Sequence, residues 1–407
     1  MSNLSRSSAA ASACALLFAT AVFAEPPAPQ VLENASLRVT VDPQAGTLDV
    51  LDKASGQRWF SAHSRKPGGE PRFRGLSRAG EAIRFEADFG ATDKRPNTVR
   101  VTLRLAGEGD LAVEADMADR NAPLKPFAFL DPLVTDSADA ALAVADYSNG
   151  HLYPANTNAP ARAHFALSRM DMPWIGVCDL ARGTGYMVLV ETSDDGTLAC
   201  PGFKVAGRDF AAPEIHWGPS KGTFAYPRRL IYHFVAKGGY VAMAKRYRAY
   251  AQQQGLIVPL AEKAKKNPNL TRLFGAPDVW GDGSLRFARE AKAAGVDKML
   301  IHGRAAPEEM KAINDLGYLT SEYDNYTDVT PLATNAAPDS SHDRIPENVV
   351  LKADGQRMTA WLTFDKKLQY MKRCPALWVE TAKQVVPKLL SKQPFLARFV
   401  DVTKIGR

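Results

Sequence analysis

Cysteine is scarce in this sequence of 407 residues, which contains only four. Cys14 falls in an apolar N-terminal segment, so Cys178, Cys200 and Cys374 allow at most one internal disulfide. Cys178 and Cys200 lie on neighbouring predicted strands and are the pair that could form it. No cysteine pair has metal-ligand spacing, and the seven histidines form no HxxxH or HxH arrangement. We therefore expect neither a metal site nor a cofactor.

Charge of one sign is not concentrated anywhere along the chain. The 51 Lys and Arg residues exceed the 44 Asp and Glu residues only mildly, and they are scattered rather than gathered in a basic arm. This pattern excludes nucleic acid as an expected partner. Beyond the N-terminal segment, no run approaches the roughly 20 apolar residues that a membrane-spanning helix needs. With 45% hydrophobic and 23% charged residues, the chain should instead form globular domains.

The first 24 residues have the pattern of a secretory signal. A polar start containing Arg6 leads into the apolar stretch 9–23, and Val22-Phe23-Ala24 places small residues where cleavage occurs. No cysteine follows this position, so a lipid anchor is not indicated. We predict a signal peptide over residues 1–24 and a periplasmic or secreted mature protein without a transmembrane span.

Residues 25–236 are predicted to form a β-sandwich domain. Hydrophobic and polar residues alternate with period two, as expected for antiparallel strands that have one solvated face. Turn signals such as Ser193-Asp194-Asp195-Gly196 separate these runs. The clearest strand candidates are residues 37–41, 48–50, 83–89, 99–105, 111–117, 174–177, 185–191 and 229–235.

Residues 237–269 are predicted to be a linker. Aromatic and apolar residues recur at helical spacing between Tyr240 and Ala251, just after Gly238-Gly239, and the stretch 262–269 is polar. We expect the aromatic stripe to dock one domain on the other.

Residues 270–407 alternate between strand and helix patterns, which is typical of a (β/α) barrel. Strands are expected at 273–280, 298–302, 318–323 and 397–402, and helices at 285–294, from Pro307 to Gly317, and from Pro375 with a kink at Pro387. The connection 327–373 is unusually long, and its Trp361 is interpreted as a lid aromatic or as the anchor of an insertion. A closed barrel takes about 250 residues, so we expect this one to be a half-barrel. Either its reading frame continues beyond Arg407 or another chain completes it, and an exposed parallel sheet edge favours the first.

The C-terminal ends of barrel strands carry the active site in this architecture. Carboxylates suit glycosidic bond cleavage and aromatic faces suit sugar rings, so the residues at these ends indicate a carbohydrate site. A histidine at the position of His302 is more often a hydrogen-bonded wall residue than a base, and Trp280 could equally be a core residue or a platform for a sugar. The candidates are Asp278, Trp280, His302, Glu322, Asp324, Asn325, Tyr326 and Asp401.

Three segments carry a resemblance to a known family: the strand that ends in Phe399-Val400-Asp401-Val402-Thr403, the run Tyr323-Asp324-Asn325-Tyr326 and the linker from Gly238 to Tyr250. They resemble the endo-α-N-acetylgalactosaminidase-like glycosidases of glycoside hydrolase family 101 and their uncharacterised relatives. The resemblance covers roughly residues 30–407. It implies a β-supersandwich followed by the first half of a (β/α)8 TIM-type barrel. It also implies that Asp401 is the nucleophile and that Asp324 binds substrate, while the acid/base glutamate would lie beyond Arg407.

Two functions remain open from the sequence. The first is an exported retaining glycosidase-like protein that acts on α-linked glycans, with N-acetylgalactosaminides suggested by the resemblance. Asp401 would be its nucleophile, and Asp324, Asn325, Tyr326, His302, Trp280 and Asp278 would bind the substrate. The alternative is a non-catalytic carbohydrate-binding or envelope-associated protein.

Overall fold

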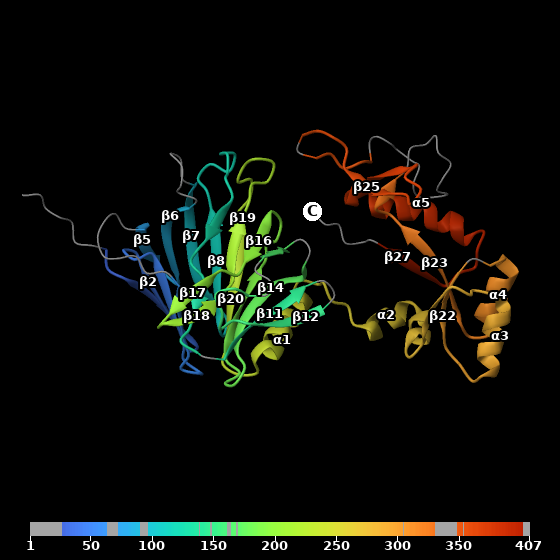
Figure 1. Cartoon of the computed structure of the whole chain (residues 1–407), viewed down its shortest axis with the longest axis horizontal. Helices are drawn as coiled ribbons and strands as arrows, with labels where there is room; N and C mark the ends of the chain where they lie inside the picture. The colour runs from blue at the N-terminus through green and yellow to red at the C-terminus, as the bar shows by residue number, and fades with distance from the viewer. Residues whose placement is uncertain are drawn as a thin grey trace, which may run out of the picture.

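The computed structural model describes residues 27–62, 72–89, 97–137, 139–146, 149–160, 164–167, 170–303, 305–329, 348–352 and 354–401. The predicted signal, residues 1–24, lies outside the described residues. Figure 1 shows antiparallel sheets gathered in one lobe and a smaller α/β lobe built from the C-terminal part of the chain.

An antiparallel sheet with strand order β1-β2-β3-β4-β10 opens the β-rich lobe. Leu37, Val39 and Val41 are fully buried while the residues between them face outward, so the predicted period of two is confirmed here. The Asp42 carboxylate accepts hydrogen bonds from the backbone N–H groups of Gln44 and Ala45, at 2.9 and 3.0 Å, in the turn that closes the first hairpin. The strands are β1 (Gln30–Glu33), β2 (Leu37–Asp42), β3 (Thr47–Asp52), β4 (Arg58–Ser61) and β10 (Leu133–Val134).

The largest sheet of the described chain has nine antiparallel strands in the order β12-β11-β14-β15-β20-β8-β7-β6-β5. Its interior strand β15 is buried on both faces, which explains the unbroken apolar run Tyr186-Met187-Val188-Leu189-Val190. The strands are β5 (Phe73–Ala79), β6 (Ala82–Phe89), β7 (Asn97–Ala106), β8 (Asp110–Asp116), β11 (Ala140–Asp146), β12 (Asn149–Pro154), β14 (Met170–Asp179), β15 (Gly185–Val190) and β20 (Arg228–Val235).

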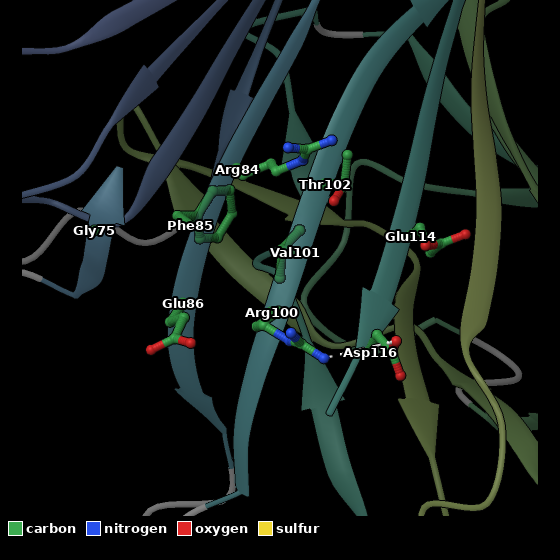
Figure 2. A pocket seen from close by; sticks show the side chains of 9 residues that line it. All are labelled: Gly75, Arg84, Phe85, Glu86, Arg100, Val101, Thr102, Glu114 and Asp116. Carbon is green, nitrogen blue, oxygen red and sulfur yellow. Dashed lines mark ion pairs between the residues drawn. The ribbon is translucent and has the colours of Figure 1, made fainter. Parts of the chain in front are cut away.

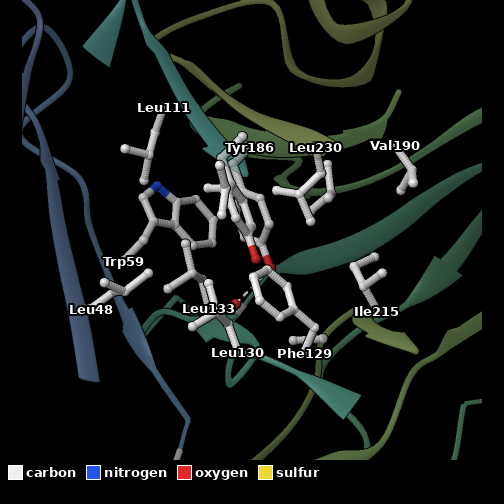
Figure 3. Close-up of a cluster of buried hydrophobic side chains, with 14 of the residues drawn as sticks. Leu48, Trp59, Leu111, Phe129, Leu130, Leu133, Tyr186, Val190, Ile215 and Leu230 are labelled. Atoms are coloured by element: carbon white, nitrogen blue, oxygen red, sulfur yellow. Dashed lines mark hydrogen bonds between the residues drawn. The ribbon is translucent and has the colours of Figure 1, made fainter. Parts of the chain in front are cut away.

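The main hydrophobic core lies between this sheet and the smaller antiparallel sheets that face it. In Figure 3, Trp59 of β4 packs against Tyr186 of β15, and their ring centroids are 4.9 Å apart. The Tyr186 hydroxyl is satisfied inside the core because it donates to the Leu133 carbonyl at 2.7 Å. The remaining strands of the lobe are β9 (Phe127–Phe129), β13 (His164–Ala166), β16 (Gly196–Ala199), β19 (Glu214–Trp217), β17 (Gly202–Val205) and β18 (Arg208–Ala211).

Helix α1 (Gly239–Gln253) packs on the outer face of the largest sheet. Its Met243 is fully buried against β14 and β15, where Gly176 and Gly185 leave room for the thioether. The partly buried Tyr247 and Tyr250 join the same cluster. The aromatic stripe was expected to dock one domain on the other, but its described apolar contacts are with the sandwich sheet itself.

The suggested Cys178–Cys200 disulfide is wrong, because both thiols are free. Cys178 lies under α1 on the outer face of the largest sheet, whereas Cys200 belongs to the core on the inner face. Burial raises the pKa of Cys178 and raises that of Cys200 to about 12, so both are held as neutral thiols.

The segment between the lobes is more ordered than predicted. Helix α2 (Leu260–Lys266) covers most of the expected polar linker, and Lys265 pairs with Glu262 one turn earlier at 2.8 Å. The 3₁₀ turn η2 (Pro268–Leu273) follows, with the Asn267 side chain capping it. The strand predicted from residue 273 is therefore wrong at its start, since β21 covers only Asp278–Trp280.

The second lobe contains a parallel sheet with strand order β21-β22-β23-β27. Helices follow its strands, which is the α/β pattern expected from the sequence, and no closed barrel is formed within the described residues. The elements are β22 (Leu300–His302), β23 (Leu319–Asn325), β27 (Ala397–Asp401), α3 (Leu285–Ala293), α4 (Pro307–Asp315), the 3₁₀ turn η4 (Pro375–Leu377) and α5 (Trp378–Leu390). Pro387 lies inside α5, and the helix continues past it.

The long third connection forms a small antiparallel sheet where it is described. Its strands are β24 (Asp328–Val329), β25 (Thr359–Leu362) and β26 (Gln369–Lys372), in the order β24-β26-β25. This sheet follows directly from the C-terminal end of β23, so the connection builds structure beside the strand ends.

Candidate functional site

The register of the parallel sheet decides which predicted site residues share a face. Trp280 is level with His302, Tyr323 with Phe399, and Asn325 with Asp401. Because side chains alternate along each strand, these residues all project from the same face. The opposite face of β21 and β22 packs Val279 and Ile301 against the helices. The chemistry-bearing side chains therefore lie on the face that α3 and α4 leave uncovered.

An aromatic cluster occupies the part of this face near the first two strands. Trp280 stacks on His302 with ring centroids 4.0 Å apart and an interplanar angle of 12°, and Phe399 meets both rings edge-on. His302 Nε2 lies 2.6 Å from Asp278 Oδ1, although the ring nitrogen is not aligned with that oxygen as a hydrogen bond. The structure therefore brings the predicted residues Asp278, Trp280 and His302 together, with Trp280 half exposed and His302 buried.

Asp401 lies at the C-terminal end of β27 beside Tyr323. The Tyr323 hydroxyl donates to Asp401 Oδ2 at 2.8 Å. Burial, and then this hydrogen bond, raise the pKa of Tyr323 to about 12, so the phenol stays protonated as a donor. One carboxylate oxygen of Asp401 is thus held in place by a neutral neighbour.

A hollow of about 440 Å³ opens over Asp401, Tyr323 and Asn325. Its other wall comes from the small sheet of the third connection. There Trp361 of β25 stacks on Tyr370 of β26, with ring centroids 4.6 Å apart and an interplanar angle of 13°. Asp328, Trp361, Tyr370 and Lys372 supply this wall.

Asn325 is fixed from both ends of its side chain. Its Nδ2 donates to Asp328 Oδ2 at 2.9 Å, and its Oδ1 accepts from the Thr327 hydroxyl at 2.7 Å. Asp328 in turn forms a 3.0 Å ion pair with Lys372. The polar floor of the hollow is therefore rigid, and the aromatic pair rises beside it.

Asp324 and Tyr326 are not brought together with Asp401. They alternate with Tyr323 and Asn325 along the chain, so they project to the opposite face of the sheet. There Asp324 forms a buried ion pair with Arg398 of β27. Burial and a hydrogen bond to Asp324 raise the pKa of Tyr326. Glu322 is buried on this face as well.

Sequence reasoning missed the contributions of Tyr323, Asp328, Tyr370 and Lys372. Two signals could have found some of them. Period-two alternation places Tyr323 with Asn325 rather than with Asp324, and the long connection carries a second aromatic, Tyr370, near Trp361. The antiparallel pairing of Asp328 with Lys372 has no signature in the sequence.

The described residues hold no group of three or more His, Cys, Asp or Glu side chains arranged as a metal site. Within the same residues, no helix is both long and apolar enough to cross a membrane.

The fold is similar to that of solved glycosidase structures. The chain resembles α-N-acetylgalactosaminidase NagBb from Bifidobacterium bifidum in complex with GalNAc, with a TM-score of 0.71 and 17% sequence identity over 93% of this chain and 70% of that one. The complex of NagBb with Gal-NHAc-DNJ matches with a TM-score of 0.70, 16% identity and the same coverage of both chains. At this identity the likeness establishes the fold alone.

No protein-family model matches the sequence, and no curated protein matches it. The comparisons therefore support a glycosidase-like fold but not the assignment to glycoside hydrolase family 101.

Proposed function

We propose that the chain is a retaining glycosidase-like protein that acts on α-linked glycans, with N-acetylgalactosaminides as the first substrate class to test. The observation that carries this proposal is Asp401 at the floor of a hollow walled by the stacked pair Trp361 and Tyr370. Aromatic faces bind the apolar faces of sugar rings, and polar groups beside them bind hydroxyls. The name of the structural neighbour NagBb suggests the substrate class.

Asp401 is proposed as the nucleophile. Its carboxylate lies at a parallel strand end, and the Tyr323 hydroxyl orients one of its oxygens. Attack on the anomeric carbon would form a glycosyl ester and release the leaving group. Asn325 and Lys372 line the same hollow and can donate hydrogen bonds to sugar hydroxyls.

The proposal does not assign an acid/base. Among the described residues that line the hollow, Asp401 and Asp328 are the carboxylates, and Asp328 is engaged by Lys372 and Asn325. This favours, as a second candidate, a protein that binds glycans without cleaving them. The two candidates differ in whether a bond to Asp401 forms.

An activated substrate separates these candidates. Fluoride leaves without needing strong general-acid help, so α-N-acetylgalactosaminyl fluoride should react even if protonation is poor. We expect intact-mass and peptide spectra after acid quenching to show one N-acetylhexosaminyl unit on the Asp401 peptide. Asp401→Asn should form no adduct, and the surface variant Asp315→Asn should behave as the parent chain. Sugar binding without an adduct on the parent chain would contradict the nucleophile and support the binding protein.

Trp361→Ala tests the binding surface independently of chemistry. We expect it to weaken GalNAc binding about tenfold, or about 1.4 kcal/mol, because it removes the aromatic wall. Phe364→Ala is the matched control, since Phe364 is fully exposed in the same hairpin and does not line the hollow. Equal affinities of the two variants in titration calorimetry would show that the sugar binds elsewhere.

Export is proposed from the N-terminal pattern. Cleavage after Ala24 would give a mature chain that begins at Glu25, in the periplasm or the medium, where glycan substrates are met. N-terminal sequencing of the protein recovered from each compartment tests this, and a retained Met1 on the exported protein would contradict it.

A further inference from the structure

A second hollow lies on the outer face of the largest sheet, far along the chain from Asp401. It has a volume of about 550 Å³ and runs across β6, β7 and β8. Figure 2 shows its side chains projecting from neighbouring strands. The outward positions are occupied by Arg84, Glu86, Arg100, Thr102, Glu114 and Asp116. Phe85 and Val101 of the same strands also border it, but their side chains are buried in the main core on the other face of the sheet.

Of the charged side chains that line this hollow, Asp116 is closed into a tight pair, because Arg120 donates to its two carboxylate oxygens at 3.0 and 2.9 Å. The others are not closed into tight pairs. Arg100 Nη2 lies 3.9 Å from Asp116 Oδ2, which is beyond hydrogen-bond distance. Within the described part of the chain, no hydrogen bond or ion pair engages the side chains of Arg84, Glu86, Thr102 or Glu114.

Closed pairs of the kind that Asp116 forms with Arg120 occur elsewhere on the same sheet as well. Arg74 and Asp88, just outside the hollow, form a two-pronged pair at 2.7 and 2.8 Å. Guanidinium and carboxylate groups on this sheet can therefore close when the geometry allows. Inside the hollow, Arg84, Glu86, Arg100 and Glu114 are not closed in this way, so their donors and acceptors can bind a ligand.

The mixture of positive and negative side chains around this hollow indicates which kind of ligand it could bind. A smaller adjoining hollow shares Thr102 and Glu114 and adds Arg104, Arg229 and Glu191. Four arginines and four carboxylates line the two described hollows, and two of the carboxylates are engaged from outside them, Asp116 by Arg120 and Glu191 by Tyr250. An anionic polymer would meet those carboxylates, whereas a neutral polyol can donate to the carboxylates and accept from the guanidinium groups.

We propose that this second hollow is a further carbohydrate-binding site, which binds neutral, hydroxyl-rich oligosaccharides along the outer face of β6, β7 and β8. It contains no exposed aromatic among its described lining residues, so binding depends on hydrogen bonds rather than on stacking. The proposal does not depend on catalysis at Asp401.

The test uses the full chain with Trp361→Ala, which removes the aromatic wall of the first site. Maltohexaose and cellohexaose are the neutral probes, and a heparin hexasaccharide is the anionic one. We expect a neutral probe to bind and to protect peptides of residues 82–116 from hydrogen exchange. Arg100→Gln with Glu114→Gln should weaken this binding at least tenfold and abolish the protection. Arg38→Gln, an outward arginine on another sheet, is the control.

Any one of three results would overturn the proposal. The first is that neither neutral probe binds with a Kd below about 10 mM, and the second is that the Arg100→Gln/Glu114→Gln chain binds the neutral probe with unchanged affinity. The third is that the heparin hexasaccharide binds more tightly than both neutral probes. Loss of GalNAc binding at the first site leaves all three readouts intact, so failure of the proposed function and failure of this proposal are distinguishable. Far-UV circular dichroism of each variant checks that the sheet is still formed.

Discussion

Replacing Asp324 by asparagine separates the role that the sequence implied from the one that the structure shows. The family resemblance made Asp324 a substrate-binding residue. The structure instead buries it behind the sheet in an ion pair with Arg398, with side-chain exposures of 7% and 12%. Asp324→Asn removes the negative charge and leaves the buried guanidinium with a neutral partner.

The expected cost is about 3 kcal/mol of local stability. Breaking a buried ion pair by removing one partner typically costs about 3–5 kcal/mol, since the remaining charge is poorly compensated. The low end applies because Glu322 is level with Arg398 in the strand register and carries a second carboxylate on this face. Asp324→Asn/Arg398→Met removes both charges and should recover most of the loss.

Hydrogen exchange measured by mass spectrometry provides a local assay. A loss of about 3 kcal/mol should speed amide hydrogen exchange of the β23 and β27 peptides more than 100-fold. This holds where the exchange rate follows the equilibrium population of the locally open state. Asp297→Asn, a surface carboxylate that is 85% exposed, should change little. Unchanged hydrogen exchange in Asp324→Asn, together with weaker GalNAc binding, would refute this reasoning and support a substrate-binding role for Asp324.

Two further predictions concern α1 and Tyr323. Met243→Ala should lower the free energy of unfolding measured by urea denaturation by about 2–5 kcal/mol, because it leaves a cavity under α1. It should also speed thiol labelling of the buried Cys178. Val241→Ala, at an exposed position of the same helix, should do neither. Tyr323 should ionise near pH 12 in ultraviolet titration, identified by its loss in Tyr323→Phe, and Asp401→Asn should lower that pKa by removing the charged acceptor. Because the unfolded phenol ionises near pH 10, Tyr323 should lose its contribution to stability as the pH rises from about 10 through 12, and an unshifted titration in Asp401→Asn would contradict the hydrogen bond.

Elements with strong periodicity could be predicted from the sequence. The first hairpin and strands β6, β7 and β8 follow from alternation, because one of their faces is buried and the other is solvated. Helix α4 follows from Pro307 at its start and Gly317 after its end. The start of β21 could not be predicted in this way, since Pro268 and the Asn267 cap favour a 3₁₀ turn over the strand that the apolar residues suggested. The domain boundaries themselves stay predictions.

The candidate site was only partly visible in the sequence, because half of its wall comes from a connection. Asp401 and Asn325 could be placed by the rule that active sites gather at strand ends. Trp361 and Tyr370 lie within the long connection, and their stacking depends on the pairing of β25 with β26 across a tight turn. Local sequence patterns do not encode which side of a short inserted sheet will face the strand ends.

The run Tyr323-Asp324-Asn325-Tyr326 shows why a short motif on a strand cannot be interpreted as one unit. Its odd-numbered residues face the hollow with Asp401, while its even-numbered residues face Arg398 on the other side. Substitutions at Tyr323 and Asn325 should therefore change sugar binding, and those at Asp324 and Tyr326 should change the stability with which β27 is held against β23. The even positions then act on Asp401 only by fixing the strand that carries it. The same alternation extends to β27, where Asp401 lines the hollow, Phe399 projects from the same face into the aromatic cluster, and Arg398 pairs with Asp324 on the other face.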